Sequence, residues 1–497
     1  MTRPTPTETL RYLAVCVLIA IGTAAIAASQ RITSLFLFAS PDGSVSPESF
    51  LELRLILAAM LPLGLALLFA RPLLAVATRL DAALAALSTR DFIWRTLALA
   101  FLLRLLVVAF LPINLYSDYG DYDQLALTWA REGCYCSEGQ FTGYWPPGYP
   151  FFLSRLYFLF GHAPIAGALA NVFLSLATAL LTHVLARRAF GKRAARWALV
   201  LMAFFPSQVL FVNLLASEMV FTPLFLLALV LVTRSESGAK LPAWIPLVAG
   251  GVALGLATLT RSLTQVFWLL LPPVWYLRHR SVSRTALNTV LVLIGMTVVL
   301  TPWIVRNQIR IGRPGVSLNG GINLMIGNHP GSGMGWNEVD PVEFNTKDPA
   351  LEPYIDREGA RRGWDYIKSD PVAFAKRGLL KVGYLYAGDM AAVWYDLTRA
   401  AERDRLDGFV ALAFVSQVYY LILLLTGLLG LLRYFRHRPA RGPTGYLLWV
   451  TIVFWTAVHF VFFGHARFHF PIMPVFCAFA ALWFTSRTTV AEIQSRA

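Results

Sequence analysis

Three carboxylates lie close together in the polar stretch formed by residues 114–150. Asp118, Asp121 and Asp123 follow directly after an apolar run that is long enough to cross a bilayer. A carboxylate at such an interface is well placed to act as a general base towards a hydroxyl or amine acceptor. This stretch is where we expect any chemistry of the protein to take place.

Asp118 and Tyr122 are four residues apart, so they share one face if this stretch is helical. A helical stretch would also place apolar side chains along the membrane surface. Asp118 then stands just outside the preceding membrane span as the candidate base. The alternative is that Asp118 only caps a helix, because Asp is a favoured N-cap residue.

Several polar residues follow apolar runs at the predicted outer ends of spans. They are Glu218, Arg261, Arg306, Asn307 and Arg467. Charged residues near membrane depth are costly and usually face a cavity or a partner. Three arginines that converge on one cavity would suit a phosphate, which a guanidinium binds in a fork. The alternative is that these side chains only snorkel to the interface.

A divalent metal is possible but not specified by the sequence. His329, His465 and His469 could bind one together with Asp118 or Asp121, although no pair has a specific ligand spacing. The sequence contains no P-loop, no dinucleotide-binding glycine pattern and no nucleophile elbow. Their absence argues against an ATP-driven or Rossmann-type enzyme.

The composition predicts an all-α polytopic membrane protein. Of 497 residues, 57% are hydrophobic and 14% charged, and many apolar runs approach the roughly 20 residues that a bilayer core requires. Hydropathy indicates about twelve spans, some of them broken or re-entrant between residues 196 and 277. The predicted spans are 11–29, 53–70, 92–112, 164–186, 196–213, 219–233, 243–260, 263–277, 284–303, 408–432, 445–463 and 470–486.

The net charge of +15 comes from basic clusters between spans. The positive-inside rule places these clusters in the cytoplasm, so anionic membrane lipids rather than nucleic acid are the expected partners. This topology places two segments on the periplasmic side of a bacterial inner membrane, residues 113–163 and 304–407.

The spans divide the chain into four parts. Residues 1–90 form an N-terminal extension with two spans, and residues 91–303 form a transmembrane core that includes the loop 113–163. Residues 304–407 form a small α-rich cap against the outer membrane surface, with helices at 354–369 and 371–387. Residues 408–497 form the last spans and a cytoplasmic tail.

Four cysteines occur in two settings. Cys16 and Cys477 lie in apolar runs and are expected to be buried. The spacing of Cys134 and Cys136 is too close for an unstrained disulfide and lacks the further ligands of a zinc site. A structural or redox-labile role for this pair stays open.

Several short motifs in a fixed order resemble the GT-C fold glycosyltransferases of the family 39 type, which include protein O-mannosyltransferases and enzymes that add aminoarabinose or galacturonic acid to lipid A and lipopolysaccharide core. The motifs are Ser117-Asp118…Tyr122…Leu125-Ala126, Pro146-Pro147-Gly148-Tyr149-Pro150 with Leu159-Phe160-Gly161, Asn213…Ser217-Glu218, Gly255-Leu256-Ala257…Leu259-Thr260-Arg261, Pro302-Trp303…Arg306-Asn307, Gly320-Gly321-Ile322-Asn323-Leu324…Gly327-Asn328, and Arg467-Phe468…Pro471…Pro474.

The resemblance implies an inverting transfer of sugar from a polyprenyl-phosphate donor on the outer side of the membrane. It maps the base onto Asp118, with Asp121 as second candidate, and an aromatic position onto Tyr122. Many relatives carry Asp-Glu where this chain has Asp118-Tyr119. The resemblance also implies basic residues that bind phosphate. Arg261 fits best, ahead of Arg306, Lys381 and Arg467, and Tyr149, Glu218 and Asn307 complete the predicted substrate-binding set.

The expected acceptor is lipid A, lipopolysaccharide core or another cell-envelope glycolipid. Alternatives are a protein acceptor, a secondary transporter or lipid flippase, and a non-catalytic scaffold of the same fold. Transporters tend to show internal repeats and ionisable residues at the midplane. This chain shows no repeat, and Arg104 is its main midspan charge.

Overall fold

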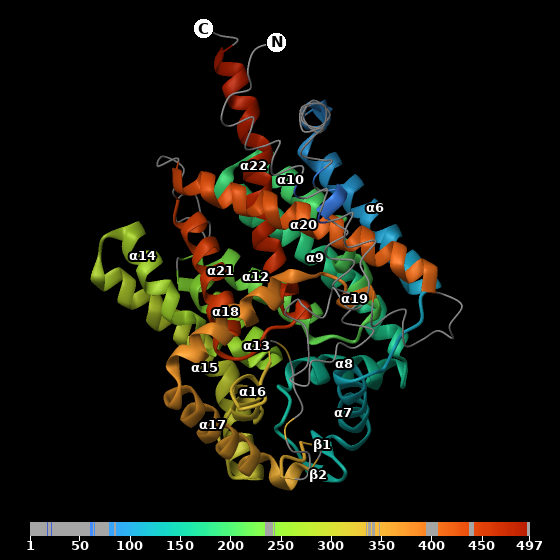
Figure 1. Ribbon diagram of the computed structural model, residues 1–497, viewed down its shortest axis with the longest axis vertical. Helices are drawn as coiled ribbons and strands as arrows, with labels where there is room; N and C mark the ends of the chain where they lie inside the picture. The colour runs from blue at the N-terminus through green and yellow to red at the C-terminus, as the bar shows by residue number, and fades with distance from the viewer. Residues whose placement is uncertain are drawn as a thin grey trace.

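The computed structural model describes residues 86–233, 244–333, 343–346, 348–393, 406–436 and 442–494, together with a few residues of the first 83 and single residues within the gaps. Within this part the protein is almost entirely helical (Figure 1). The strands described are β1 (Cys136–Ser137) and β2 (Gln140–Phe141), which pair antiparallel with Cys136 opposite Phe141.

Six segments are long and apolar enough to cross a membrane. They are α6 (Thr89–Phe110), α9 (Pro164–Phe190), α15 (Val282–Ile311), the part Ala411–Arg436 of α20 (Leu406–Arg436), α21 (Pro443–Val461), and Ala466–Thr485, which joins η7 (Ala466–Ile472) to α22 (Met473–Gln494). A polytopic helical membrane protein is therefore confirmed. The number twelve is not, and the predicted spans 11–29 and 53–70 fall almost wholly outside the described residues.

A broken span accounts for a possible seventh crossing. Helix α10 (Lys192–Ala203) is followed by α11 (Pro206–Leu210) and η1 (Phe211–Asn213), with a bend of 58° between the two parts. Two shorter apolar helices follow, α12 (Ser217–Val232) and α13 (Trp244–Thr260). The predicted span 263–277 consists of η2 (Ser262–Leu270) and α14 (Leu271–His279).

Buried polar side chains satisfy the backbone at the bend. Arg104 of α6 donates from Nη1 to the carbonyl of Ala203 at 2.9 Å and from Nε to Ser175 Oγ at 2.6 Å. Asn171 donates to the carbonyl of Leu214 at 2.9 Å. Lipid offers no hydrogen bonds, so irregular backbone persists at membrane depth only where protein groups supply them. The midspan charge of Arg104 thus has a structural role.

Glycines allow the central helices to approach closely. A Cβ atom on Gly251 of α13 would lie 2.1 Å from the carbonyl oxygen of Val292 in α15. The reciprocal position, Gly295, would lie 2.2 Å from the carbonyl oxygen of Val248. Small residues at helix crossings let backbones pack directly against each other in membranes. These two helices therefore pack with their backbones in direct contact.

The end of the molecule opposite the C-terminal end of α22 carries the shorter helices (Figure 1). It contains α7 (Asp118–Glu132), α8 (Gly148–Phe160), α16 (Gly320–Gly327), η3 (Pro349–Leu351) and α17 (Glu352–Ser369). Helix α18 (Pro371–Ala387) and the short α19 (Ala391–Val393) lead back towards the spans. The helices predicted at 354–369 and 371–387 are confirmed by α17 and α18.

Candidate active site

Arg467 joins two carboxylates that come from different parts of the chain. Its Nε lies 2.5 Å from Glu218 Oε1, and its Nη2 lies 3.4 Å from Glu218 Oε2. Its Nη1 lies 3.0 Å from Asp118 Oδ2. The guanidinium also lies over the ring of Tyr119, 5.0 Å from its centroid. One arginine therefore orders the start of α7 and the start of α12 together.

Arg261 extends this network to a fourth charged side chain. Its Nη1 lies 2.9 Å from Glu218 Oε1 and 3.0 Å from Ser217 Oγ. The two carboxylates and the two guanidinium groups balance each other. Pairing of this kind is needed because an isolated buried charge is strongly destabilising. The Glu218 side chain is fully buried, whereas 28% of the Asp118 side chain is exposed.

Each member of the network lies where a helix begins or breaks. Asp118 is the first residue of α7, and Glu218 lies in the first turn of α12. Arg261 follows the end of α13, and Arg467 belongs to the 3-10 segment η7 before α22. Interrupted helices thus bring four side chains to one place at the ends of apolar segments.

The backbone at Asp118 differs from a simple helix cap. The N-cap is Ser117, whose φ of 56° is an unusual, strained conformation for a residue other than glycine. Asp118 is the next residue, and its carboxylate contacts Arg467 and, at 3.4 Å, Ser117 Oγ. The cap interpretation therefore does not describe Asp118, which directs its carboxylate into the charged network.

Aromatic rings lie beside the network. The ring of Tyr122 makes edge contacts with Trp145 and Tyr149, at centroid distances of 5.3 and 5.4 Å. Burial, reinforced by the carboxylate of Asp118, raises the pKa of Tyr122 well above its ordinary value. Tyr122 therefore stays a neutral phenol at physiological pH. The predicted shared face of Asp118 and Tyr122 is confirmed, and Tyr149 is buried behind it.

The turn before α8 packs directly on the residues that precede Arg261. A Cβ atom on Gly148 would lie 2.6 Å from Thr260 Oγ1 and 2.8 Å from the Thr260 nitrogen. Only glycine fits this approach without a shift of the backbone. The turn before α8 and Arg261 are thus held in a fixed position relative to each other.

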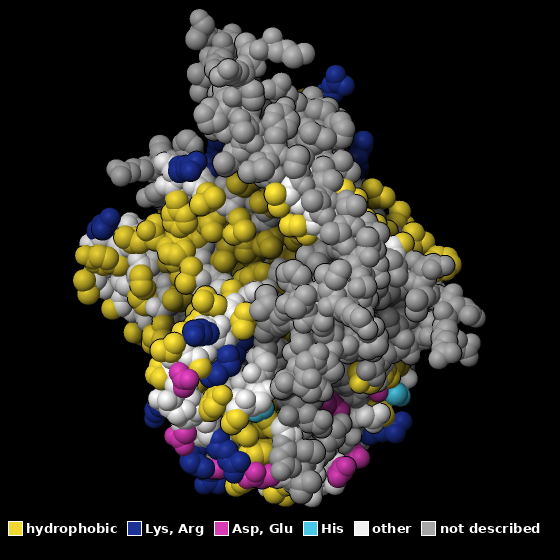
Figure 2. Space-filling view, viewed as in Figure 1, with side chains coloured by type: hydrophobic (Ala, Val, Ile, Leu, Met, Phe, Trp, Pro, Cys, Tyr) yellow, Lys and Arg dark blue, Asp and Glu magenta, His cyan; other side chains and the backbone are white. Residues whose placement is uncertain are grey.

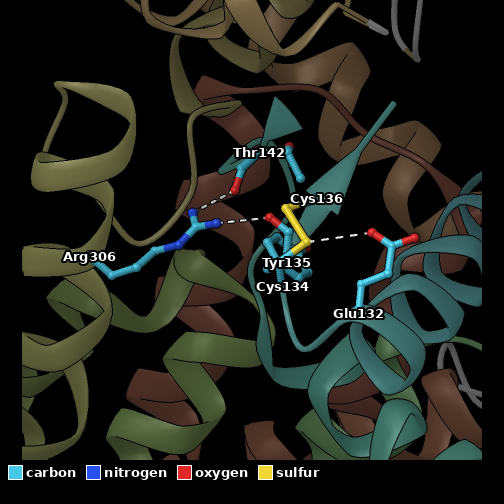
Figure 3. Close-up of a disulfide and its surroundings, with 6 residues drawn as sticks. All are labelled: Glu132, Cys134, Tyr135, Cys136, Thr142 and Arg306. Carbon is cyan, nitrogen blue, oxygen red and sulfur yellow. Dashed lines mark hydrogen bonds between the residues drawn. A yellow bond between two sulfur atoms is a disulfide. The ribbon is translucent and has the colours of Figure 1, made fainter. Parts of the chain in front are cut away.

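Arg306 and Asn307 have other partners. Arg306 donates from Nη1 to the carbonyl of Thr142 at 2.7 Å and from Nη2 to that of Tyr135 at 2.8 Å (Figure 3). Its guanidinium lies 4.7 Å from the Trp303 ring centroid. Asn307 donates to the carbonyl of Gly315 at 2.9 Å. These contacts fasten the loop between α7 and α8 to α15.

The same loop carries a disulfide between Cys134 and Cys136, whose Cα atoms are 5.4 Å apart (Figure 3). Their close spacing, which argued against an unstrained bond, does not prevent the structure from joining them. The pair thus forms a local cross-link, and its structural or redox-labile role stays a prediction. Cys477 is a buried free thiol, as predicted.

Asp121 and Lys381 complete the predicted set. Asp121 lies in the first turn of α7 and is partly exposed. Lys381 is buried in α18, where Nζ donates to Asn328 Oδ1 and to the carbonyl of Val461, both at 3.2 Å. Its hydrogen-bond partners are therefore different from those of Arg261.

The histidines considered for a metal are engaged separately. His465 Nδ1 accepts from the Arg467 backbone N–H at 3.1 Å, and His469 contacts Asp389 Oδ1 at 3.1 Å. In the part of the chain that the structure describes, no group of three or more His, Cys, Asp or Glu residues could hold a metal ion. The carboxylates of Asp118 and Glu218 bind arginines instead, so we derive no step through a metal.

Two further buried carboxylates lie near the site but were not predicted from the sequence as site residues. Asp123 accepts from Tyr157 and contacts His162 Nε2 at 2.9 Å. Glu352 accepts from Thr142 Oγ1 and from the Gly143 backbone N–H. Asp123 is conspicuous as the third acid of its cluster, but nothing local to Glu352 indicates a partner about 200 residues earlier. Both carboxylates hold the segments that surround the site.

The chain is similar to known proteins both in sequence family and in fold. Residues 145–305 match the family described as dolichyl-phosphate-mannose-protein mannosyltransferase. The apo oligosaccharyltransferase of Archaeoglobus fulgidus superposes with a TM-score of 0.50 at 14% identity, covering 82% of this chain and 52% of that one. The chain has the GT-C glycosyltransferase fold. The family match over residues 145–305 and the shared fold confirm the predicted resemblance.

Two other GT-C structures show weaker similarity. AglB of Archaeoglobus fulgidus, in complex with an inhibitory peptide and a dolichol-phosphate, has a TM-score of 0.48 at 14% identity, covering 82% of this chain and 52% of that one. ArnT of Cupriavidus metallidurans, bound to undecaprenyl phosphate, has a TM-score of 0.41 at 16% identity, covering 80% and 76%. The chain spans about half the length of the archaeal proteins. No curated protein sequence matches the chain significantly.

Proposed function

We propose that the protein transfers a sugar from a polyprenyl-phosphate donor to a glycolipid of the cell envelope, such as lipid A or lipopolysaccharide core. The reaction takes place on the periplasmic face of a bacterial inner membrane. The observation that carries the proposal is the partly exposed carboxylate of Asp118, held by Arg467 beside Glu218 and Arg261. A base and two cations thus meet at the outer ends of apolar helices.

The transfer is an inverting displacement at the anomeric carbon of the sugar. The acceptor hydroxyl attacks this carbon, and its proton passes to Asp118. The bond between the anomeric carbon and the phosphate oxygen breaks, and its electron pair leaves with the polyprenyl phosphate. A positioned carboxylate of this kind contributes about 10²–10⁴-fold to the rate. Arg467 holds one oxygen of the Asp118 carboxylate, which fixes the direction of the other.

Arg261 is our candidate for the leaving phosphate. Its contacts with Glu218 and Ser217 both use Nη1, so Nε and Nη2 can donate to a phosphate in a fork. Charge that develops on the leaving group is stabilised most effectively by donors that are already oriented. Glu218 orients Arg261 and neutralises part of its charge. The lipid tail of the donor stays in the membrane while its headgroup reaches the arginine.

One observation favours a second acceptor class. The family that matches residues 145–305 is described by transfer of mannose to protein. A protein hydroxyl would use the same base and the same leaving group, so the geometry of Asp118 and Arg261 serves either acceptor. The distinction must come from the product.

The test uses the full-length protein in proteoliposomes, a set of polyprenyl-phosphate sugars, and glycolipid and Ser/Thr-rich peptide acceptors in parallel. Mass spectrometry of the acceptors identifies the sugar and the acceptor class. We expect D118N to lose about 10²-fold or more in rate, while the matched variant D121N retains activity within a few fold. The opposite pattern would transfer the role of base to Asp121. If the wild-type protein moves no sugar from any donor, the proposed function is wrong.

A further inference from the structure

Helix α18 has one apolar face and one basic face. Val372 and Leu379 are 65% and 69% exposed, whereas Arg377 and Lys381, four residues apart, lie on a shared face. Basic side chains gather over α18 at the border of the hydrophobic surface (Figure 2). An amphipathic helix of this kind lies in the membrane interface with its apolar side towards lipid. The apolar side of α18 therefore faces lipid, whereas Arg377 and the fully buried Lys381 face the protein at the depth of the membrane interface.

Lys381 is a buried cation with neutral partners. It donates to Asn328 Oδ1 and the carbonyl of Val461, and its Nζ lies 5.7 Å from the centroid of the Phe374 ring. Its third proton therefore meets no oxygen acceptor among the described residues. Within the described residues it makes no ion pair with a carboxylate. Burial, with a contribution from Arg377, lowers the pKa of Lys381 to about 8. A buried charge without a counter-charge is costly unless a ligand compensates it.

Arg377 offers two more donors. Its Nη1 lies 3.3 Å from the hydroxyl of Tyr366, and its guanidinium stacks 4.6 Å from the centroid of that ring. Its Nε and Nη2 are buried and have no acceptor in the described part of the chain. The stacking leaves the edge of the guanidinium, which carries these two donors, available for a bidentate ligand.

His329 offers a fourth donor. Its Nδ1 accepts from the Gly331 backbone N–H at 3.1 Å, so the neutral ring carries its proton on Nε2. This Nε2 is buried and meets no acceptor among the described residues. Burial, followed by the charge of Arg377, lowers the pKa of His329. Asn328, the neighbour of His329, contacts Lys381 directly.

We propose that His329, Arg377 and Lys381 form a second anion site, which binds the phosphate of a membrane lipid. A phosphate has enough acceptor oxygens to satisfy all of these donors, and the fork of Arg377 matches its geometry. The position of α18 at the headgroup level selects a phosphate that is attached to a lipid. In the described part of the chain, no hydrogen bond or ion pair joins this site to Asp118, Glu218, Arg261 or Arg467.

The test measures thermal unfolding of the full-length protein in neutral detergent while dioleoyl phosphatidic acid is titrated. Dioleoylglycerol is the matched ligand because it lacks only the phosphate. We expect phosphatidic acid, and not dioleoylglycerol, to raise the melting temperature. R377Q and K381M should each weaken the apparent affinity by about tenfold or more. K376Q, which removes an exposed charge next to Arg377, should bind as the wild type does.

Further variants and ligands in the same experiment distinguish the second site from the candidate active site and lipid from free phosphate. K381M removes a buried charge, so this variant should fold without ligand. If its melting temperature no longer rises with phosphatidic acid, the reason is a loss of binding and not a loss of folding. R261Q should keep the rise in melting temperature with phosphatidic acid. If R261Q loses this rise and K381M keeps it, the phosphate binds at the candidate active site, and the proposal of a second site is wrong. An equal response to inorganic phosphate would overturn the assignment to lipid. D118N should respond as the wild type does, so failure of sugar transfer does not affect this result.

Discussion

Arg467 and Glu218 are 249 residues apart in the chain, yet their side chains form a buried fork. The Nε–Oε1 and Nη2–Oε2 distances are 2.5 and 3.4 Å. The third guanidinium nitrogen is thereby directed at Asp118, 3.0 Å away. The ion pair therefore does more than neutralise charge, because it sets the orientation of the candidate base from the far end of the chain.

Replacing Arg467 by lysine keeps the charge and removes the fork. Lysine is a single point charge, so it cannot contact Glu218 twice and Asp118 at the same time. We expect R467K to fold and to lose about 10²-fold in transfer rate. R361K, at a 60% exposed side chain of α17, is the matched control and should be neutral. A transfer rate of R467K within threefold of the wild type would show that the fork does not orient the base.

Arg261 and Asp118 should differ in the kinetic constant that they affect. A phosphate is already charged in the bound donor, so R261Q should raise KM for the donor and also lower kcat as the leaving charge grows. Asp118 takes a proton during the reaction, so D118N should lower kcat with little change in KM. Steady-state kinetics with varied donor concentration distinguish the two patterns. Identical patterns would contradict the separate roles.

The sequence predicts the fold class and the composition of the charged site well. Long apolar runs indicate membrane helices because lipid tolerates few alternatives. Charged residues at the ends of such runs are costly, so Glu218, Arg261 and Arg467 attract attention without any structure. Their assembly around Asp118 is a finding of the structure. Their catalytic and binding roles stay predictions.

The partners of each polar side chain could not be predicted. Arg306 and Arg261 have the same type of position in the sequence, after an apolar run. One donates to backbone carbonyls of a loop, and the other pairs with Glu218. The difference depends on tertiary contacts more than 40 residues away in the chain. The predicted number of twelve spans is not confirmed, because in the described part several apolar runs form short helices or a pair bent at a break.

Arg306 should matter for stability more than for binding. R306M leaves the carbonyl of Thr142 without its donor, and a buried unsatisfied group costs about 1–3 kcal/mol. The carbonyl of Tyr135 loses one of two donors and keeps the backbone N–H of Thr142 at 3.2 Å. R310M removes only a cation–π contact with Phe141, worth about 0.5–1 kcal/mol at a partly exposed site. Chemical unfolding in detergent should rank R306M well below R310M. Equal stability would contradict the anchoring role of Arg306.

Gly148 should be intolerant of even a methyl group. The Cβ atom of G148A would meet Thr260 at 2.6–2.8 Å, so the turn must move away from the residues before Arg261. We expect transfer activity to fall by about tenfold or more, because small displacements of catalytic groups are costly. The matched variant is G383A in α18, where a Cβ atom meets nothing within 4 Å. This variant should be neutral or slightly stabilising, since alanine favours helix.

Lys381 makes the stability of the protein depend on pH in a defined direction. Burial lowers its pKa from 10.5 to about 8, which corresponds to a cost of about 3 kcal/mol when the ammonium is charged in both states. Below about pH 8 this cost is fully present. Between about pH 8 and 10.5 the unfolded chain binds more protons than the folded one, so stability rises with pH.

K381M should therefore be more stable than the wild type at pH 7 in the absence of phosphate, and the difference should shrink as the pH is raised to 9.5. Melting temperatures of both proteins in neutral detergent, measured at half-unit steps of pH, provide the comparison. K376Q removes an exposed lysine of the same helix and should run parallel to the wild type at every pH. A constant difference between K381M and the wild type would mean that the Lys381 side chain keeps one charge state across this range, because only a change of its protonation can make the difference vary.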